Sequence, residues 1–243
     1  MRTNPLPQIS ALRPLRWRAG FTLVEIMTVM MVIAILLSVA AVGIQNIDRG
    51  QATTTAASVT EALFDEARSA AVGRGIRSRL IIHKQFNDEE PKDQQRYLRY
   101  MWVAVEDTNQ EGNAQGGGWK VLSRPTKLPD GVYFSFEESE KVADRIEVGK
   151  PGTMSIDLPG SDSDSGSNSF KECYYFEFNP EGVCVDSENA AGRPGAAVVL
   201  ISGSRAKGQE EPRLLKNNKV GFVVWRNGRT SIFRSPKQID LAQ

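Results

Sequence analysis

Few residues in this chain of 243 residues have side chains placed for acid–base, nucleophilic or metal chemistry. The single histidine, His83, lies in the strand-like stretch Ile81–Lys84. Neither a cysteine nucleophile nor a pair of carboxylates stands at a useful spacing from it. We therefore expect a histidine at the surface or at a strand edge, and we predict that the chain is not an enzyme.

The two cysteines, Cys173 and Cys184, lie far from any cluster that could supply four zinc ligands, so no metal site and no cofactor is predicted. The turn Asn179–Gly182 predicts a hairpin in which Cys184 pairs with Glu177. Cys173 would then lie four residues further along the strand, roughly 13 Å away at about 3.3 Å per residue. Because a disulfide needs Cα atoms within roughly 7 Å, we expect free thiols, with a disulfide as the alternative.

Two segments have side chains that could bind ions or phosphates. Residues 160–168 contain two aspartates among serines and glycines, so calcium binding is an alternative to the surface loop that we expect there. Near Trp225 and Phe233, four basic residues could contact DNA: Arg226, Arg229, Arg234 and Lys237. We expect a solvated strand face at these positions, with DNA as a secondary candidate partner.

One carboxylate, Glu25, stands at the start of a long apolar segment. Residues 26–44 contain no charge and no proline, and about 19 residues at 1.5 Å rise nearly match the roughly 30 Å hydrocarbon layer. We therefore predict a transmembrane helix over residues 21–47. A carboxylate is costly inside a bilayer, so Glu25 marks a functional position that needs a partner.

The first twenty residues differ in charge from the rest of the chain. They contain four arginines and no acidic residue, and their removal changes the formal net charge from +1 to −3. The positive-inside bias places this leader in the cytoplasm and predicts that everything after Ile47 is exported, which gives a single-pass membrane protein with its bulk outside the cytoplasm. The nearly balanced total charge points neither to nucleic-acid binding nor to disorder.

After the apolar segment, the pattern predicts an amphipathic stem helix over residues 48–76 that ends at Gly73 or Gly75. Its small apolar residues recur every three or four positions: Ala52, Ala56, Val59, Leu63, Ala67 and Ala70. Short β-type runs follow over residues 77–243: Ser78–Ile82, Tyr97–Val105, Trp119–Leu122, Val132–Phe136, Cys173–Phe178, Ala196–Ile201, Val220–Trp225 and Thr230–Phe233. The expected class is α+β, with one long N-terminal helix packed on an antiparallel β-sheet domain.

The segment Gly-Phe-Thr-Leu-Val-Glu at residues 20–25 resembles the processing motif of type IV prepilins and type II secretion pseudopilins. The resemblance implies a pilin-like fold, cleavage after Gly20 by a dedicated prepilin peptidase, and N-methylation of Phe21. It also implies that Glu25 helps subunits to join a filament through their N-terminal helices. The alternatives are a conventional secretory signal cut after Ala40 and a simple membrane anchor.

Elementary electrostatics favours the same role for Glu25. Cleavage creates a charged amine on Phe21, and the Glu25 carboxylate of a neighbouring subunit can neutralise it. Cleavage also removes the leader arginines, whose hydration opposes withdrawal of the helix from the bilayer. The cut is therefore expected to permit assembly.

Later segments are similar to the GspH/FimT group of minor pseudopilins and minor pilins. They are residues 67–71 with Arg74, Leu128–Val132, Phe176–Gly182 and Val224–Arg229. The leading prediction is a minor pseudopilin at or near the tip of a type II secretion pseudopilus. The alternatives are a minor pilin that primes a type IV pilus, with or without DNA uptake, and a membrane-anchored periplasmic binding module.

Overall fold

The structure is a computed structural model in which the chain divides into two compact units, Met1–Gln45 and Asn46–Gln243. The side chains of residues 39–49 and 216–217 lie outside the description. The described residues are 21–87, 90–107, 118–157, 170–186, 192–206, 208–209, 211–233 and 238. The predicted leader, residues 1–20, lies outside them.

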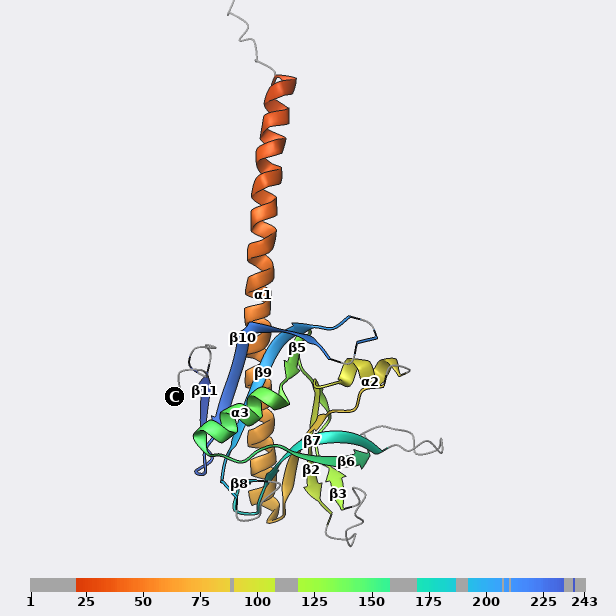
Figure 1. Ribbon diagram of the computed structural model, residues 1–243, viewed down its shortest axis with the longest axis vertical. Helices are drawn as coiled ribbons and strands as arrows, with labels where there is room; N and C mark the ends of the chain where they lie inside the picture. The colour runs from red at the N-terminus through yellow and green to blue at the C-terminus, as the bar shows by residue number, and fades with distance from the viewer. Residues whose placement is uncertain are drawn as a thin grey trace, which may run out of the picture. The chain divides into compact units, whose positions relative to one another are not determined.

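The long helix α1 runs from Leu23 to Arg74, 52 residues (Figure 1). It starts at a side-chain cap, because the Glu25 amide donates to Thr22 Oγ1 at 3.2 Å. It ends at Gly75, whose φ of 64° is left-handed and whose amide donates to the Ala71 carbonyl at 2.9 Å. The predicted long N-terminal helix and its glycine end are confirmed.

In the first unit, the described part of α1 presents large apolar side chains to the surroundings. Phe21 is 78% exposed and Leu36 is 63% exposed. No helix among the described residues is long and apolar enough to cross a membrane. The predicted segment 21–47 includes residues whose side chains lie outside the description, from 39 onward. Its membrane crossing stays a prediction.

In the second unit, the described strands form two antiparallel sheets (Figure 1). Sheet A has the order β3-β2-β1-β7-β6, with β4 paired to β2 and β8 paired to β7; sheet B has the order β11-β10-β9-β5. The strands of sheet A are β1 (Ser78–His83), β2 (Tyr100–Glu106), β3 (Trp119–Val121), β4 (Thr126–Lys127), β6 (Gly152–Asp157), β7 (Phe170–Phe178) and β8 (Cys184–Val185). Those of sheet B are β5 (Val132–Phe134), β9 (Ala196–Ser204), β10 (Arg213–Val224) and β11 (Thr230–Phe233).

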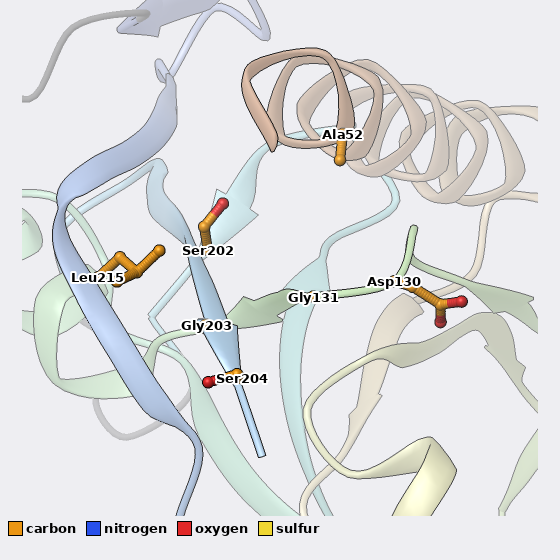
Figure 2. A pocket seen from close by; sticks show the side chains of 7 residues that line it. All are labelled: Ala52, Asp130, Gly131, Ser202, Gly203, Ser204 and Leu215. Atoms are coloured by element: carbon orange, nitrogen blue, oxygen red, sulfur yellow. The ribbon is translucent and has the colours of Figure 1, made fainter. Parts of the chain in front are cut away.

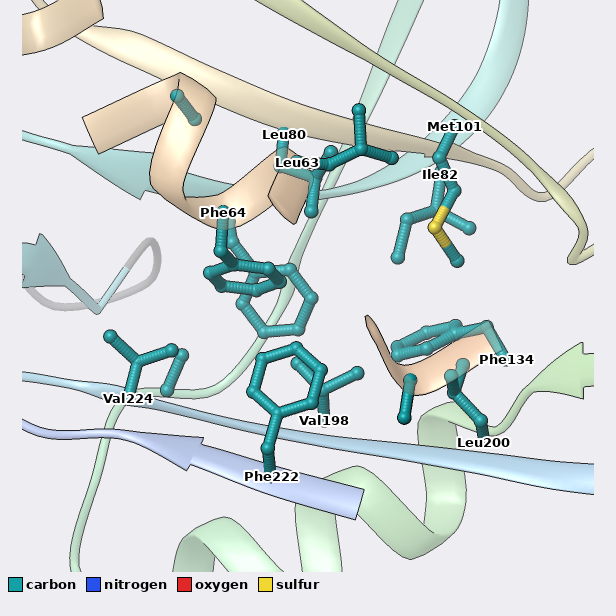
Figure 3. Close-up of a cluster of buried hydrophobic side chains, with 14 of the residues drawn as sticks. Leu63, Phe64, Leu80, Ile82, Met101, Phe134, Val198, Leu200, Phe222 and Val224 are labelled. Carbon is teal, nitrogen blue, oxygen red and sulfur yellow. The ribbon is translucent and has the colours of Figure 1, made fainter. Parts of the chain in front are cut away.

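The core of this unit lies between the sheets and the stem part of α1 (Figure 3). Phe64 is 1% exposed, and its ring centroid lies 5.1 Å from that of Phe176 and 5.3 Å from that of Phe222. One helical side chain thus contacts both sheets. The predicted stem face is correct over most of its length, since Ala56 and Ala67 are fully buried. Small side chains let the helix backbone approach the sheets closely.

The α+β class is confirmed, but the sequence analysis missed α3, the helix Phe136–Ile146. The run that we predicted as a strand to Phe136 stops at Phe134, and Ser135 caps the helix by accepting a hydrogen bond from the Glu138 amide. The Ser-x-x-Glu spacing is that of a capping box and was the available signal. The sequence analysis also missed a short helix, α2 (Pro91–Arg96).

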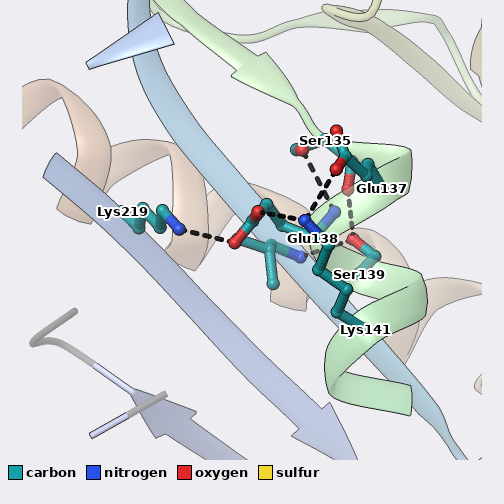
Figure 4. A network of polar contacts seen from close by, with 7 residues as sticks. Ser135, Glu137, Glu138, Ser139, Lys141 and Lys219 are labelled. Atoms are coloured by element: carbon teal, nitrogen blue, oxygen red, sulfur yellow. Dashed lines mark hydrogen bonds and ion pairs between the residues drawn. The ribbon is translucent and has the colours of Figure 1, made fainter. Parts of the chain in front are cut away.

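Helix α3 covers the edge of β9 that β5 leaves unpaired (Figure 4). The Ser135 amide donates to the Val199 carbonyl at 2.9 Å, and the Val199 amide donates to Ser139 Oγ at 2.9 Å. Lys219 of β10 pairs with Glu138 at the same place. Both backbone groups of Val199 are therefore satisfied without a further strand, which protects the edge from pairing with another chain.

The hairpin of β7 and β8 has a different register from the predicted one. Cys184 pairs with Phe178, not with Glu177. Because side chains alternate between the faces of a sheet, this shift of one residue moves Cys184 to the opposite face. Cys184 packs in the core around Phe64, whereas Cys173 packs on the outer face beside Trp102. Both thiols are free and buried, and the sheet separates them.

Candidate functional site

The predicted processing site lies at the N-terminal end of α1, of which the structure describes residues from Phe21 onward. Phe21 and Thr22 precede the helix, and Glu25 is in its first turn. The Glu25 side chain is exposed, and no ion pair is recorded for it within the described residues. An acidic side chain in the first turn stabilises the helix, because its negative charge interacts favourably with the positive end of the helix dipole. Gly20 lies outside the described residues, so the cleavage position stays a prediction.

The backbone amide and the side-chain carboxylate of Glu25 have different roles. Its amide is bonded to Thr22, which fixes where the helix begins, while its carboxylate remains free to meet a cation from another molecule. Phe21 lies just outside the first turn, so an amine created there by cleavage would be on the outer side of this cap. The geometry is compatible with the predicted pairing between subunits and does not test it.

Of the four predicted DNA contacts, the structure describes Arg226 and Arg229. Arg226 and Arg229 belong to the turn between β10 and β11, and both are exposed. Strand β11 then runs away from that turn, since Thr230 pairs with Val224 and Phe233 pairs with Gly221. At about 3.3 Å per residue, the strand ends roughly 10 Å from the turn. Arg234 and Lys237 follow it and lie outside the described residues.

A second cluster, which the sequence analysis missed, joins three of the dispersed motifs through Arg68 of α1. Its Nε donates to the Gly182 carbonyl at 3.1 Å, and its Nη1 donates to the Gly228 carbonyl at 3.3 Å. Its Nη2 donates to the Asn227 carbonyl at 3.4 Å. One guanidinium thus ties the stem to the β7–β8 turn and to the β10–β11 turn.

The glycines of these two turns are needed for this contact. Gly182 and Gly228 both have a φ of 76°, a backbone conformation that residues other than glycine rarely adopt. A Cβ on Gly228 would lie 2.0 Å from Arg68 Cζ, and one on Gly182 would lie 2.6 Å from Val72 Cγ2. The stem motif that contains Arg68 and the two turn motifs are therefore parts of one structural contact. In the sequence, these three motifs are far apart.

His83 is fully buried, so the expected surface position is wrong. Its Nε2 lies 3.6 Å from Asp93 Oδ1, and Lys171 Nζ lies 2.9 Å from Asp93 Oδ2. Burial lowers the pKa of His83 to about 4, and the positive charges of Arg96 and Lys171 act in the same direction. The neutral imidazole forms part of the contact between α2 and sheet A. Its strand partner on β7 is Cys173, and burial raises the pKa of that thiol to about 12.

No metal site was predicted from the sequence, and calcium binding was an alternative only for residues 160–168. No group of three or more His, Cys, Asp or Glu side chains in the part that the structure describes could hold a metal ion. The serine- and aspartate-containing segment 160–168, the alternative calcium site, lies outside the described residues. Two pockets in the described part of the chain are small. One of about 170 Å³ lies between Ala52 and Gly203 (Figure 2), and one of about 190 Å³ lies beside Glu172.

Comparison with known proteins identifies the N-terminal segment. Residues 18–41 match the model of the prokaryotic N-terminal methylation motif. The chain thus carries the N-terminal signature of the type IV prepilin and pseudopilin family, and the recognition made from residues 20–25 is confirmed. The motif covers the N-terminal segment only.

Two further comparisons were made. A search of curated proteins found no match. Among solved structures, the minor pseudopilin EpsH from the Type 2 Secretion System of Vibrio cholerae is similar at 10% identity. The alignment covers 76% of this chain and 97% of EpsH, with a TM-score of 0.36. A TM-score of this size does not establish a shared fold.

Proposed function

We propose that this chain is a type IV pilin-like subunit with a structural, non-enzymatic role. A prepilin peptidase cuts it after Gly20 and methylates the new N-terminus at Phe21. Residues 21–47 anchor it in the inner membrane, residues 48–76 form the stem, and residues 77–243 form a periplasmic β-rich domain. Glu25 then pairs with a neighbouring subunit when the helix enters a filament.

The observation that carries this proposal is the methylation motif at residues 18–41, which coincides with the start of a helix of 52 residues. The motif supports processing, and the helix supplies the element that filament subunits pack together. The exposed apolar side chains of residues 21–37 support the same conclusion, because a surface of this kind needs lipid or other helices around it.

Within this class we propose a minor pseudopilin at or near the tip of a type II secretion pseudopilus. The support is the similarity of the stem and turn motifs to the GspH/FimT group, now joined in space by Arg68. A minor pilin that primes a type IV pilus is the second candidate, supported by the same motifs. Purification of the intact membrane complex followed by mass spectrometry of its subunits would distinguish the two.

The decisive experiment is mass analysis of the mature N-terminus in the native host. We expect a protein that begins with N-methylated Phe21, and we expect Gly20→Glu to block processing because the peptidase needs a small residue there. Gly50→Glu is the matched control, since Gly50 is exposed and nothing lies within 4 Å of its Cβ position. A mature N-terminus at Ala41 would identify a conventional secretory signal and overturn the proposal.

A further inference from the structure

The end of the second unit at which α1 terminates carries a preorganised surface. It comprises Arg68 and Val72 of α1 with Trp225, Arg226 and Arg229 of the β10–β11 turn, and we call it the distal surface. Three hydrogen bonds from Arg68 hold the two neighbouring turns against the helix. A surface that is already rigid loses little conformational entropy when a partner binds.

The distal surface contains an open groove of about 570 Å³, lined by Val183, Trp225, Arg226 and Asn227. Trp225 is 39% exposed, and its Nε1 donates to Ser231 Oγ at 2.8 Å, which fixes the orientation of the ring. Val72, which lies against Gly182, is 54% exposed. A rigid, half-exposed tryptophan beside arginines is the composition typical of residues that dominate binding energy at protein interfaces.

The charges around this groove are unbalanced. Arg226 and Arg229 are exposed, the Arg68 guanidinium donates to turn carbonyls, and within the described residues none of the three forms an ion pair. Two carboxylates lie near these groups: Glu181 accepts a hydrogen bond from Asn179 Nδ2 at 3.1 Å, and Glu61 accepts one from Thr230 Oγ1. The three guanidinium groups outnumber them. The distal surface is therefore apolar at its centre and positively charged at its rim.

We propose that the distal surface docks an acidic peptide segment of a protein partner, with an apolar side chain of that segment on Trp225 and its carboxylates on Arg226 and Arg229. Charge complementarity selects the acidic segment, because guanidinium groups bind carboxylates in a bidentate geometry. Nucleic-acid binding depends on the neutralisation of many phosphates, for which the two exposed arginines of this surface are few. The inference goes beyond the proposed filament role and does not depend on it.

The test uses the full chain in micelles of a neutral detergent and a fluorescein-labelled peptide of alternating Glu and Leu as the probe, with binding measured by fluorescence anisotropy. We expect saturable binding that Arg226→Glu/Arg229→Glu weakens about ten-fold or more. Trp225→Ala should weaken it as well. The matched control is Arg124→Glu/Arg213→Glu, because both residues are exposed, no ion pair is recorded for either within the described residues, and the change in net charge is the same.

Three outcomes would overturn the proposal. Equal weakening by the control variant would show a nonspecific charge effect. Tighter binding of labelled oligothymidylate than of the peptide, with the same dependence on Arg226 and Arg229, would identify a nucleic-acid surface. Binding of a Lys and Leu peptide as tight as that of the Glu and Leu peptide would exclude the charge complementarity. Thermal unfolding of each variant shows whether the fold is retained.

Discussion

The two parts of α1 differ in how their apolar side chains are used. In the first unit, Leu23 is 76% exposed and Met31 is 68% exposed, whereas in the second unit Phe64 is 1% exposed and Ala67 is fully buried. The same helix therefore exposes its apolar side chains in one part and buries them against its own chain in the other. The stem is stabilised by its own chain, and the N-terminal part needs other molecules.

This difference predicts that substitutions in the two parts have separable effects. A change near the N-terminus should alter processing or assembly and leave the unfolding of the β-rich unit unchanged. A change in the stem core should alter stability and leave processing unchanged. The predictions below test this separation, from the largest expected effect to the smallest.

The largest effect is expected for Glu25→Val. Its carboxylate is the proposed partner of the Phe21 amine of another subunit, so the variant should be processed and inserted in the membrane but absent from filaments. Glu25→Asp should give a partial defect, because the charge survives with a shorter reach. Immunoblots of sheared filaments and membranes measure the distribution, and Glu66→Val, at an exposed stem position, is the control. Normal incorporation of Glu25→Val would show that recruitment depends on the β-rich domain.

The second prediction concerns Phe64, which contacts both sheets. Phe64→Ala should lower the free energy of unfolding by about 3–5 kcal/mol, because it leaves a cavity between rings that now pack together. Denaturant unfolding of the full chain in detergent, followed by near-ultraviolet circular dichroism, measures this. Val72→Ala, at a position 54% exposed, should change stability little. A loss of N-terminal processing in Phe64→Ala would contradict the separation of the two parts.

The third prediction is a pH dependence confined to the β-rich unit. The pKa of His83 is about 4 in the folded protein and about 6.5 in the unfolded chain, so between these values the unfolded chain binds more protons. Stability is therefore complete above about pH 6.5 and falls on acidification, by on the order of 3 kcal/mol near pH 4. Unfolding of the parent and of His83→Gln as a function of pH checks this. An unchanged slope in the variant would assign the effect to carboxylates.

The smallest effect is expected when the cysteines are treated with thiol reagents or reducing agents. Burial raises the pKa of Cys173 to about 12 and also raises that of Cys184, so both thiols should be protonated and unreactive at neutral pH. A chromogenic disulfide reagent should modify neither thiol in the folded protein and both in denaturant. Reducing agents should leave the melting temperature unchanged. Rapid modification of the native protein, or a mass decrease that indicates a disulfide, would contradict the register described here.

How much could be predicted depended on whether a feature is local. The α1 helix and the methylation motif are contiguous patterns, and both were predicted correctly. Helix α3 was missed although Ser135 and Glu138 gave a local signal, because Phe136 was assigned to the preceding strand. The burial of His83 had no local signal at all, since it depends on α2 packing over the end of β1.

Arg68 and the cysteines show the same limit. A guanidinium that bonds to turns more than 100 positions away has no signature in its neighbouring residues. The register of β7 and β8 depends on the details of one turn, and an error of one residue placed Cys184 on the wrong face.

The sequence by itself determined the N-terminal methylation motif, because a small residue, a bulky apolar residue and a carboxylate define it by their order along the chain. It also determined the α+β class, because helical and strand periodicities are local. Only the tertiary structure decided that two sheets close around Phe64, that His83 is neutral and buried, and that Arg68 joins the two turns beside the distal surface. These features depend on contacts between residues far apart in the chain, and such contacts form only when the whole unit packs.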